Sequence, residues 1–216
     1  MDSQRGPHPA SWLHRQDQNR TSGTFTLVPA PTFRFAGTAD IPAVVRLVQS
    51  AYRGERSRGG WTTEADLIDG QRIDESMLAE LIDRPSTHVL LAETDRIVGC
   101  CELSMHDAKA DTAYFGMFAV DPVEQSSGIG RALLDEAESI AAGMMGAASM
   151  ALVTIHLRNE VIAMYERRGF VITGETHPFP YGDERYGRPR RDDLHLVAME
   201  KVLAPPITSS GNDQGR

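Results

Sequence analysis

The sequence contains few cysteines and no long apolar run. Only two of its 216 residues are cysteines, the adjacent Cys100 and Cys101, in a stretch that predicts a strand. Neighbouring strand residues point to opposite faces, so we expect two buried thiols in a reducing compartment and no disulfide between them. No apolar run approaches the roughly 20 residues of a membrane-spanning helix. The N-terminal stretch also lacks the apolar centre of a signal peptide, so we expect a cytoplasmic protein without a membrane partner.

Basic residues are outnumbered by acidic ones. The 22 Lys and Arg against 30 Asp and Glu give a net charge of −8. This balance argues against nucleic acid or an anionic membrane as a partner, and an acidic field favours an amine-bearing substrate. Hydrophobic residues at 41% and charged residues at 24% are typical of a soluble globular protein. The length suits one domain.

Composition and hydrophobic periodicity divide the chain into three parts. Residues 1–31 are polar and without a hydrophobic period, which predicts a disordered arm, and residues 204–216 predict a disordered tail. Residues 32–203 form the predicted domain. We expect strands at 32–36, 88–92, 97–105, 114–120, 150–155, 170–174 and 194–202. Helices are expected after a cap at Thr38 or Asp40, at 74–83, after Gly128, and at 159–168. This order predicts a mixed α/β sheet layered with helices.

The stretch from Tyr114 to Gly146 predicts a buried strand, a tight polar turn and an amphipathic helix. The turn and the first helical residues are Gln125, Ser126, Ser127, Gly128, Ile129, Gly130 and Arg131. A glycine-rich turn that leads into a helix presents unpaired backbone N–H groups, backed by the positive end of the helix dipole. Such a turn favours an anion, and a phosphate is the natural candidate.

Two common phosphate-binding motifs do not fit this turn. A nucleotide-binding P-loop requires Lys followed by Ser or Thr, and neither pair follows Gly130. A dinucleotide fingerprint requires a third glycine, which is absent. These absences disfavour a nucleotide-binding regulator.

Two segments resemble the GCN5-related N-acetyltransferase (GNAT) family. Gln-x-x-Gly-x-Gly, after a strand that ends in Val120-Asp121-Pro122, resembles the coenzyme A diphosphate loop of that family. Residues 163–170 (AMYERRGF) are similar to a family segment that ends in Y-E-[KR]-x-G-[FY]. The expected order of elements matches as well, so the resemblance covers roughly Thr32 to Val202.

The resemblance implies a mostly antiparallel sheet with helices on both faces, in which strands 114–120 and 150–155 are parallel and splayed. It implies acetyl-CoA as co-substrate, without a metal. The turn residues would bind its diphosphate, and backbone groups of Met117, Phe118 and Val120 would pair with its pantetheine arm. An amide near Phe118 would stabilise the developing oxyanion. Tyr165 would protonate the leaving sulfur. The acceptor would be a primary amine of a small molecule or peptide, and a homodimer remains open.

The sequence departs from the family pattern at two positions. Ser126 stands where the family has a small residue, and it fits if its backbone avoids positive φ. Arg158 stands where the family often has an asparagine, and we interpret it as a solvated charge.

The general base is not evident from the sequence. Glu102 is a candidate, although a strand residue on an exposed face is the alternative interpretation. His106 and His156 at strand ends are further candidates. A chain of water molecules would make a single base unnecessary.

Two loops, in which the sequence shows no sustained helix or strand pattern, are expected to bind the acceptor. Trp61 and Glu64 lie in residues 53–73, and Tyr181 lies in residues 177–193. The charged or aromatic residues Asp66, Asp183, Glu184, Tyr186, Arg190 and Arg191 also lie there. An acidic group would hold an ammonium, and arginines would suit a substrate carboxylate, as in an amino acid. A non-catalytic acyl-CoA-binding or sensing module is the alternative to an enzyme.

Overall fold

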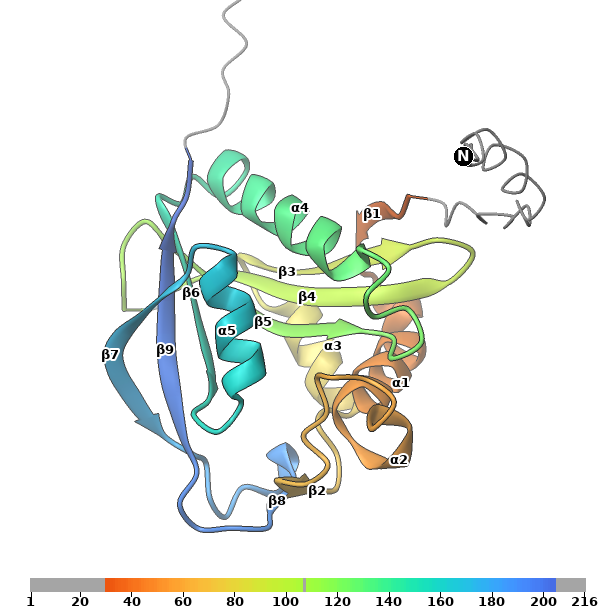
Figure 1. The fold of residues 1–216 in the computed structure, drawn as a ribbon. Coiled ribbons are helices and arrows are strands. Elements are labelled where there is room, and N and C mark those ends of the chain that lie inside the picture. Colours follow the sequence, from red (N-terminus) through yellow and green to blue (C-terminus); the bar gives the residue numbers. More distant parts are fainter. Residues whose placement is uncertain (1–29, 107, 205–216) are drawn as a thin grey trace, which may run out of the picture.

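The computed structural model describes residues 30–106 and 108–204 (Figure 1). The long strands are β1 (Thr32–Phe35), β3 (Thr87–Glu93), β4 (Ile97–Met105), β5 (Thr112–Val120), β6 (Ser149–Ile155), β7 (Val171–Pro178) and β9 (His195–Val202). The helices are α1 (Ile41–Tyr52), α2 (Gly54–Ser57), α3 (Glu75–Asp83), α4 (Ile129–Gly143) and α5 (Asn159–Arg167), with 3-10 turns η1 (Thr38–Asp40) and η2 (Glu184–Tyr186). The predicted N-terminal arm and C-terminal tail lie almost entirely outside the described residues.

Seven strands form one sheet in the order β1-β3-β4-β5-β6-β9-β7. The β5–β6 pair is parallel, and every other neighbouring pair is antiparallel. Pairing between β5 and β6 covers only three positions and ends at Tyr114 opposite Ala151. Beyond that point the two strands separate, which confirms the expected parallel and splayed pair.

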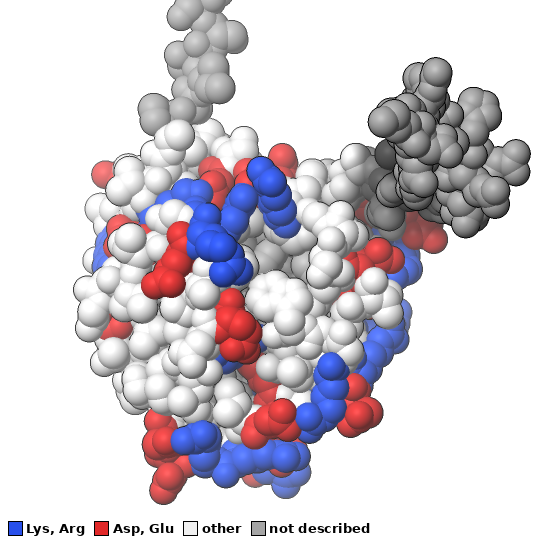
Figure 2. Space-filling view, viewed as in Figure 1, with Lys and Arg blue, Asp and Glu red and all other residues white. Residues whose placement is uncertain are grey.

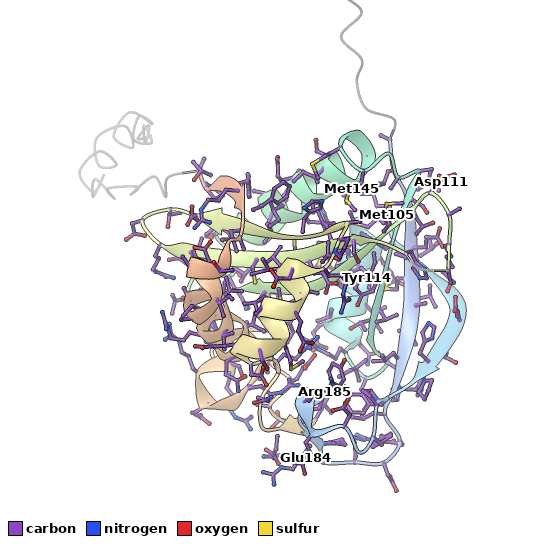
Figure 3. The ribbon with its side chains drawn as sticks, turned by 180° about the vertical axis from the view of Figure 1, so that it is seen from behind. Met105, Asp111, Tyr114, Met145, Glu184 and Arg185 are labelled. Carbon is purple, nitrogen blue, oxygen red and sulfur yellow. The ribbon has the colours of Figure 1, made fainter. Side chains whose placement is uncertain are left out.

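Helices cover both faces of the sheet. Figures 1 and 3, from opposite sides, show α4 and α5 on one face and α1 and α3 on the other. The core accordingly has two layers. Leu133, Val161 and Cys101 belong to the α4–α5 layer, and Val48 and Cys100 belong to the α1–α3 layer. Both cysteines are buried free thiols on opposite faces, as predicted from the alternation of strand side chains.

One helix cap was not predicted from the sequence. Asp74 caps α3 as a side-chain acceptor of the Met77 N–H at 2.9 Å. Asp40 precedes α1, but its carboxylate accepts from the Gly37 N–H and pairs with Arg34 instead of capping the helix. The Asp40 carboxylate, which was a predicted cap of this helix, is therefore occupied by Arg34.

Two short strands join the loops that were expected to bind the acceptor. β2 (Ile68–Asp69) lies in the first loop, and β8 (Arg188–Pro189) lies in the second, where the sequence predicted no strand. β7 also extends four residues further than predicted. Among the described residues no helix is both long and apolar enough to cross a membrane.

Candidate active site

The first turn of α4 presents backbone donors without acceptors. Gly128 has φ +95°, and a Cβ built there would meet no atom within 4 Å, so this turn opens to space. Within the described ranges, the four N–H groups from Gly128 to Arg131 donate no hydrogen bond. The adjacent Arg131 side chain is 77% exposed, and its Nε lies 3.7 Å from Asp135 Oδ2 on the next turn of the helix. The start of this 15-residue helix therefore has the backbone geometry that an anion cradle requires.

Ser126 differs from its expected backbone conformation. Its φ is +75°, in the left-handed region that the sequence interpretation required it to avoid. For a non-glycine residue this conformation costs roughly 1–2 kcal/mol. The loop is nevertheless well anchored, because the Ser127 hydroxyl donates to the Glu124 carbonyl at 2.6 Å and Ile129 is buried in the core.

The Gln125 side chain fastens the loop to its neighbours. Its Oε1 accepts from the Trp61 N–H at 2.9 Å, and its Nε2 donates to Thr62 Oγ1 at 2.9 Å and to the Val120 carbonyl at 3.2 Å. Gln125 therefore links the cradle to the first acceptor loop. Its amide groups are engaged by the protein.

A bulge in β5 turns the backbone next to the cradle. The register with β4 shifts between Cys100 and Glu102, and Met117 has φ +46°. A Cβ on Gly116 would lie 2.7 Å from Tyr114 Cε1, so the Tyr114 ring leaves no room for a larger residue at this position. The Phe118 carbonyl accepts from the Tyr52 hydroxyl at 2.5 Å, so α1 holds the bulged segment from the side.

A cavity of about 410 Å³ occupies the space between the splayed strands and the two loops. Its wall includes Tyr52, Trp61, Arg72, Tyr114, Met117, Phe118, Thr154, Phe179, Tyr186 and Leu196. Figure 3 shows Tyr114 near the centre of the molecule, seen from behind. On the face in Figure 2, acidic and basic side chains lie side by side and do not form a surface of one sign.

Tyr165 reaches the cavity from α5. Its ring packs against Phe170 at 5.5 Å and against Phe115 at 6.4 Å, and only 6% of the residue is exposed. Tyr165 is one of the residues that line the cavity, and its hydroxyl has no hydrogen-bond partner in the described part of the chain. Burial raises the pKa of Tyr165 well above 10, so the hydroxyl keeps its proton at neutral pH.

Glu64 forms a buried ion network with two arginines. Arg158 Nη1 donates to Glu64 Oε1 at 2.9 Å, and Arg53 Nη1 donates to Glu64 Oε2. Arg158 also donates to the Thr62 carbonyl. The interpretation of Arg158 as a solvated charge is therefore wrong, because it is 5% exposed. Both Glu64 oxygens are engaged by the protein, so Glu64 organises the loop and is not a free ligand for an ammonium.

Glu102 is half-buried beside the cavity. It lies opposite Gly116 across the β4–β5 pair, and its Oε2 is 3.2 Å from a Cβ built on that glycine. Burial raises the pKa of Glu102, although Arg84 and Arg72 oppose the shift. The exposed-face interpretation of Glu102 is therefore wrong. His106 and His156 are not among the residues that line the cavity.

Only some of the loop residues singled out from the sequence line the cavity, namely Trp61, Glu64 and Tyr186. Trp61 lies on the cavity wall with 41% exposure. Tyr181 is absent from that wall, and its hydroxyl accepts from the Leu194 N–H at 2.6 Å. Arg190 pairs with Asp69, and Arg191 pairs with Asp193.

The sequence analysis did not identify three residues that line the cavity, Arg72, Tyr52 and Tyr114. No motif marks these positions as functional, although Arg72 belongs to a loop that was expected to bind the acceptor. Within residues 30–106 and 108–204, no cluster of three His, Cys, Asp or Glu side chains could hold a metal ion.

Comparisons with known proteins find the same fold. Solved structures with the same fold include the ribosomal-protein-S18-alanine N-acetyltransferase of Escherichia coli, with 19% identity, TM-score 0.57, and coverage of 84% of this chain and 97% of that chain. Ard1 of Thermoplasma volcanium has 22% identity and TM-score 0.59, and the match covers 81% of this chain and 99% of that chain. A spermidine N-acetyltransferase chimera of SpeG from Vibrio cholerae and hSSAT has 17% identity and TM-score 0.58, and the match covers 80% of this chain and 95% of that chain.

No curated protein matches the chain. At these identities the solved structures show the shared fold and nothing finer. The model of the Acetyltransferase (GNAT) family, however, matches residues 42–170, which is more than half of the sequence. The chain therefore belongs to the GNAT acetyltransferase family.

Proposed function

We propose that this protein transfers an acetyl group from acetyl-CoA to a primary amine of a small molecule or peptide. The observation that carries the proposal is the open cradle from Gly128 to Arg131, next to the gap where β5 and β6 separate. A cradle alone would fit many phosphates. Its position at the end of a splayed strand pair favours a long ligand with a diphosphate at one end.

The residues present fit coenzyme A. The unpaired N–H groups of the α4 N-terminus suit a diphosphate, and the glycine at 128 leaves space for it. Gly130 brings α4 close to β5, since a Cβ there would lie 3.4 Å from Val120 Cγ2. When bound, acetyl-CoA supplies the thioester whose acetyl group is transferred.

The bulge in β5 gives the chain an oxyanion donor. The left-handed conformation of Met117 reorients the following peptide, and we assign the Phe118 N–H to the developing negative charge of the thioester oxygen. Loss of one such donor typically lowers kcat by about 10²–10³-fold. The Tyr52 hydroxyl on the Phe118 carbonyl fixes this peptide.

Two side chains handle protons. Glu102 accepts the proton that the acceptor ammonium loses, and the neutral amine of the acceptor then forms the new C–N bond as the C–S bond breaks. Tyr165 donates its proton to the leaving thiolate, and the second proton that the acceptor nitrogen loses restores the Tyr165 hydroxyl. The raised pKa of Glu102 brings its affinity for a proton nearer to that of an amine, and the raised pKa of Tyr165 keeps the donor protonated.

Coenzyme A binding to the Gly128→Glu variant tests the cradle. Calorimetry with CoA, ATP and NAD should show binding of CoA by the parent and no binding by the variant, because the new carboxylate occupies the diphosphate position. Gly128→Ala controls for the strain of a side chain at positive φ. Gly143→Glu adds the same charge at the other end of α4, where a Cβ also meets no atom within 4 Å.

Equal CoA affinity in the parent and in Gly128→Glu would refute the cradle. Stabilisation of the parent by ATP and not by CoA would overturn the whole proposal. CoA binding without transfer to any amine would favour the non-catalytic binding module.

A further inference from the structure

One arginine of the cavity has no hydrogen-bond or ion-pair partner among the described residues. Arg72 follows β2, and its backbone N–H donates to Gln49 Oε1 at 3.0 Å, which fixes the loop. Its guanidinium lies over the Tyr52 ring, 5.5 Å from the centroid, and lines the cavity. In the described part of the chain its side chain makes no hydrogen bond and no ion pair. The planar fork of its donors therefore remains available to a ligand.

The other arginines of the wall are already engaged. Arg53 and Arg158 share Glu64, whose two oxygens they occupy. The charged residues that line the cavity are thus three arginines and one glutamate, a net charge of +2. If the ionised carboxylate of Glu102, which lies beside the wall, is included, the net charge is +1. This local sign is opposite to the net charge of the whole chain, which is −8.

Arg72 stays charged in this setting. Burial acts to lower its pKa, but Glu64, Tyr52, Tyr114 and Glu102 act in the other direction, and its pKa lies above the ordinary value. A half-buried guanidinium without an acceptor has lost part of its hydration and gained no hydrogen bond in return. A carboxylate or other anionic oxygen group would form charge-assisted, bidentate hydrogen bonds with it.

We propose that the acceptor carries an anionic oxygen group, a carboxylate first, beside its primary amine, and that Arg72 binds that group. This inference rests on the proposed acetyl transfer. It names zwitterionic amines such as amino acids as the substrate class, with the anion on Arg72 and the amine near Glu102. Dicationic amines are disfavoured, because a second positive charge would meet the arginine excess of the wall.

A substrate panel measured with the parent and with variants tests the inference. The panel contains α-amino acids, their α-carboxamides, aminophosphonic acids and diamines up to spermidine. Values of kcat/KM are compared as ratios of variant to parent for each compound, so differences in amine pKa cancel. We expect the parent to prefer the anionic amines over carboxamides and diamines.

The Arg72→Gln substitution should remove the preference for anionic amines and leave the activity on carboxamides nearly unchanged. Hydrogen bonds to charged groups contribute about 1.5–3 kcal/mol, so kcat/KM for anionic amines should fall about 10–100-fold. The carboxamides should change less than about threefold, since they lack the charged acceptor. Arg72→Lys should retain part of the preference, because the charge remains without the fork. Arg46→Gln, at an exposed arginine of α1, is the matched control and should behave as the parent.

Binding gives a second readout. The N-acetylated form of the best anionic amine should bind the CoA-saturated parent in calorimetry and bind Arg72→Gln about 10–100-fold more weakly. CoA affinity should be unchanged, which shows that the variant is folded. Equal losses for acids and carboxamides, or a parent that prefers carboxamides or diamines, would overturn the inference while the acetyl transfer stands. Absence of transfer to any amine would instead overturn the proposed function, and this inference with it.

Discussion

The Glu64→Gln substitution tests the buried ion network directly. Gln has nearly the same shape as Glu, but it removes the negative charge that Arg53 and Arg158 share. The side chains of these two arginines are only 2% and 6% exposed, and that of Glu64 is 9% exposed. Each arginine also has a buried Nε without a partner, so the network has no spare acceptor to replace the carboxylate.

The expected cost is large. Removal of one partner from a buried ion pair typically destabilises a protein by about 3–5 kcal/mol, because the remaining charge stays buried without compensation. For a domain of this size 1 kcal/mol lowers Tm by about 2–4 °C, which predicts a fall of roughly 6–20 °C. That loss is a substantial part of a typical unfolding free energy of about 5–15 kcal/mol.

The loss should also depend on pH. Burial alone would raise the pKa of Glu64, but Arg158 and Arg53 hold it below the ordinary value of 4.5. The carboxylate therefore contributes stability that is fully present above pH 4.5 and is lost as pH falls through the folded-state pKa. The difference in unfolding free energy between parent and variant should shrink below pH 4.5.

Urea denaturation of both proteins between pH 4 and pH 8 measures the difference. Glu55→Gln is the matched control. It lies in the same loop, its side chain is 92% exposed, and its neighbour is a surface arginine, so its unfolding midpoint should not move. Two results would contradict the account of a network that needs its anion. One is a Glu64→Gln variant whose unfolding free energy is lower than that of the parent by less than about 1 kcal/mol at pH 7, and the other is a difference in unfolding free energy that stays constant down to pH 4.

Three further outcomes are expected. Tyr165→Phe should lower kcat by about 10²-fold without changing CoA affinity, and an unchanged kcat would remove Tyr165 from the mechanism. In the parent, kcat/KM should rise with pH through a pKa above 4.5, because Glu102 must be ionised to accept a proton. Glu102→Gln should abolish that inflection, and its persistence would identify another base. Ser126→Gly should raise the unfolding free energy by about 0.5–1 kcal/mol, because glycine adopts positive φ without strain. Ser127→Gly, which loses the hydrogen bond to Glu124, should lower it instead.

Sequence reasoning was most successful where the signal is local. The boundaries of β4 match the prediction, and α3, α5 and the start of α4 follow from the hydrophobic periodicity. Prediction failed where a side chain had a competing partner elsewhere, as with Asp40, whose carboxylate pairs with Arg34. It also failed in the second acceptor loop, where β8 exists because β2 lies beside it.

The sequence by itself determined the strand, the glycine turn and the helix that form the cradle, because these depend on neighbours a few residues away. It also placed Tyr165 in a recognisable segment. Only the tertiary structure decided which charges are paired. Glu64 lies 11 residues from Arg53 and 94 residues from Arg158, and no local pattern reports such contacts. The same is true of Arg72, which has no partner among the described residues, while the other arginines of the cavity hold Glu64, the carboxylate that lines it.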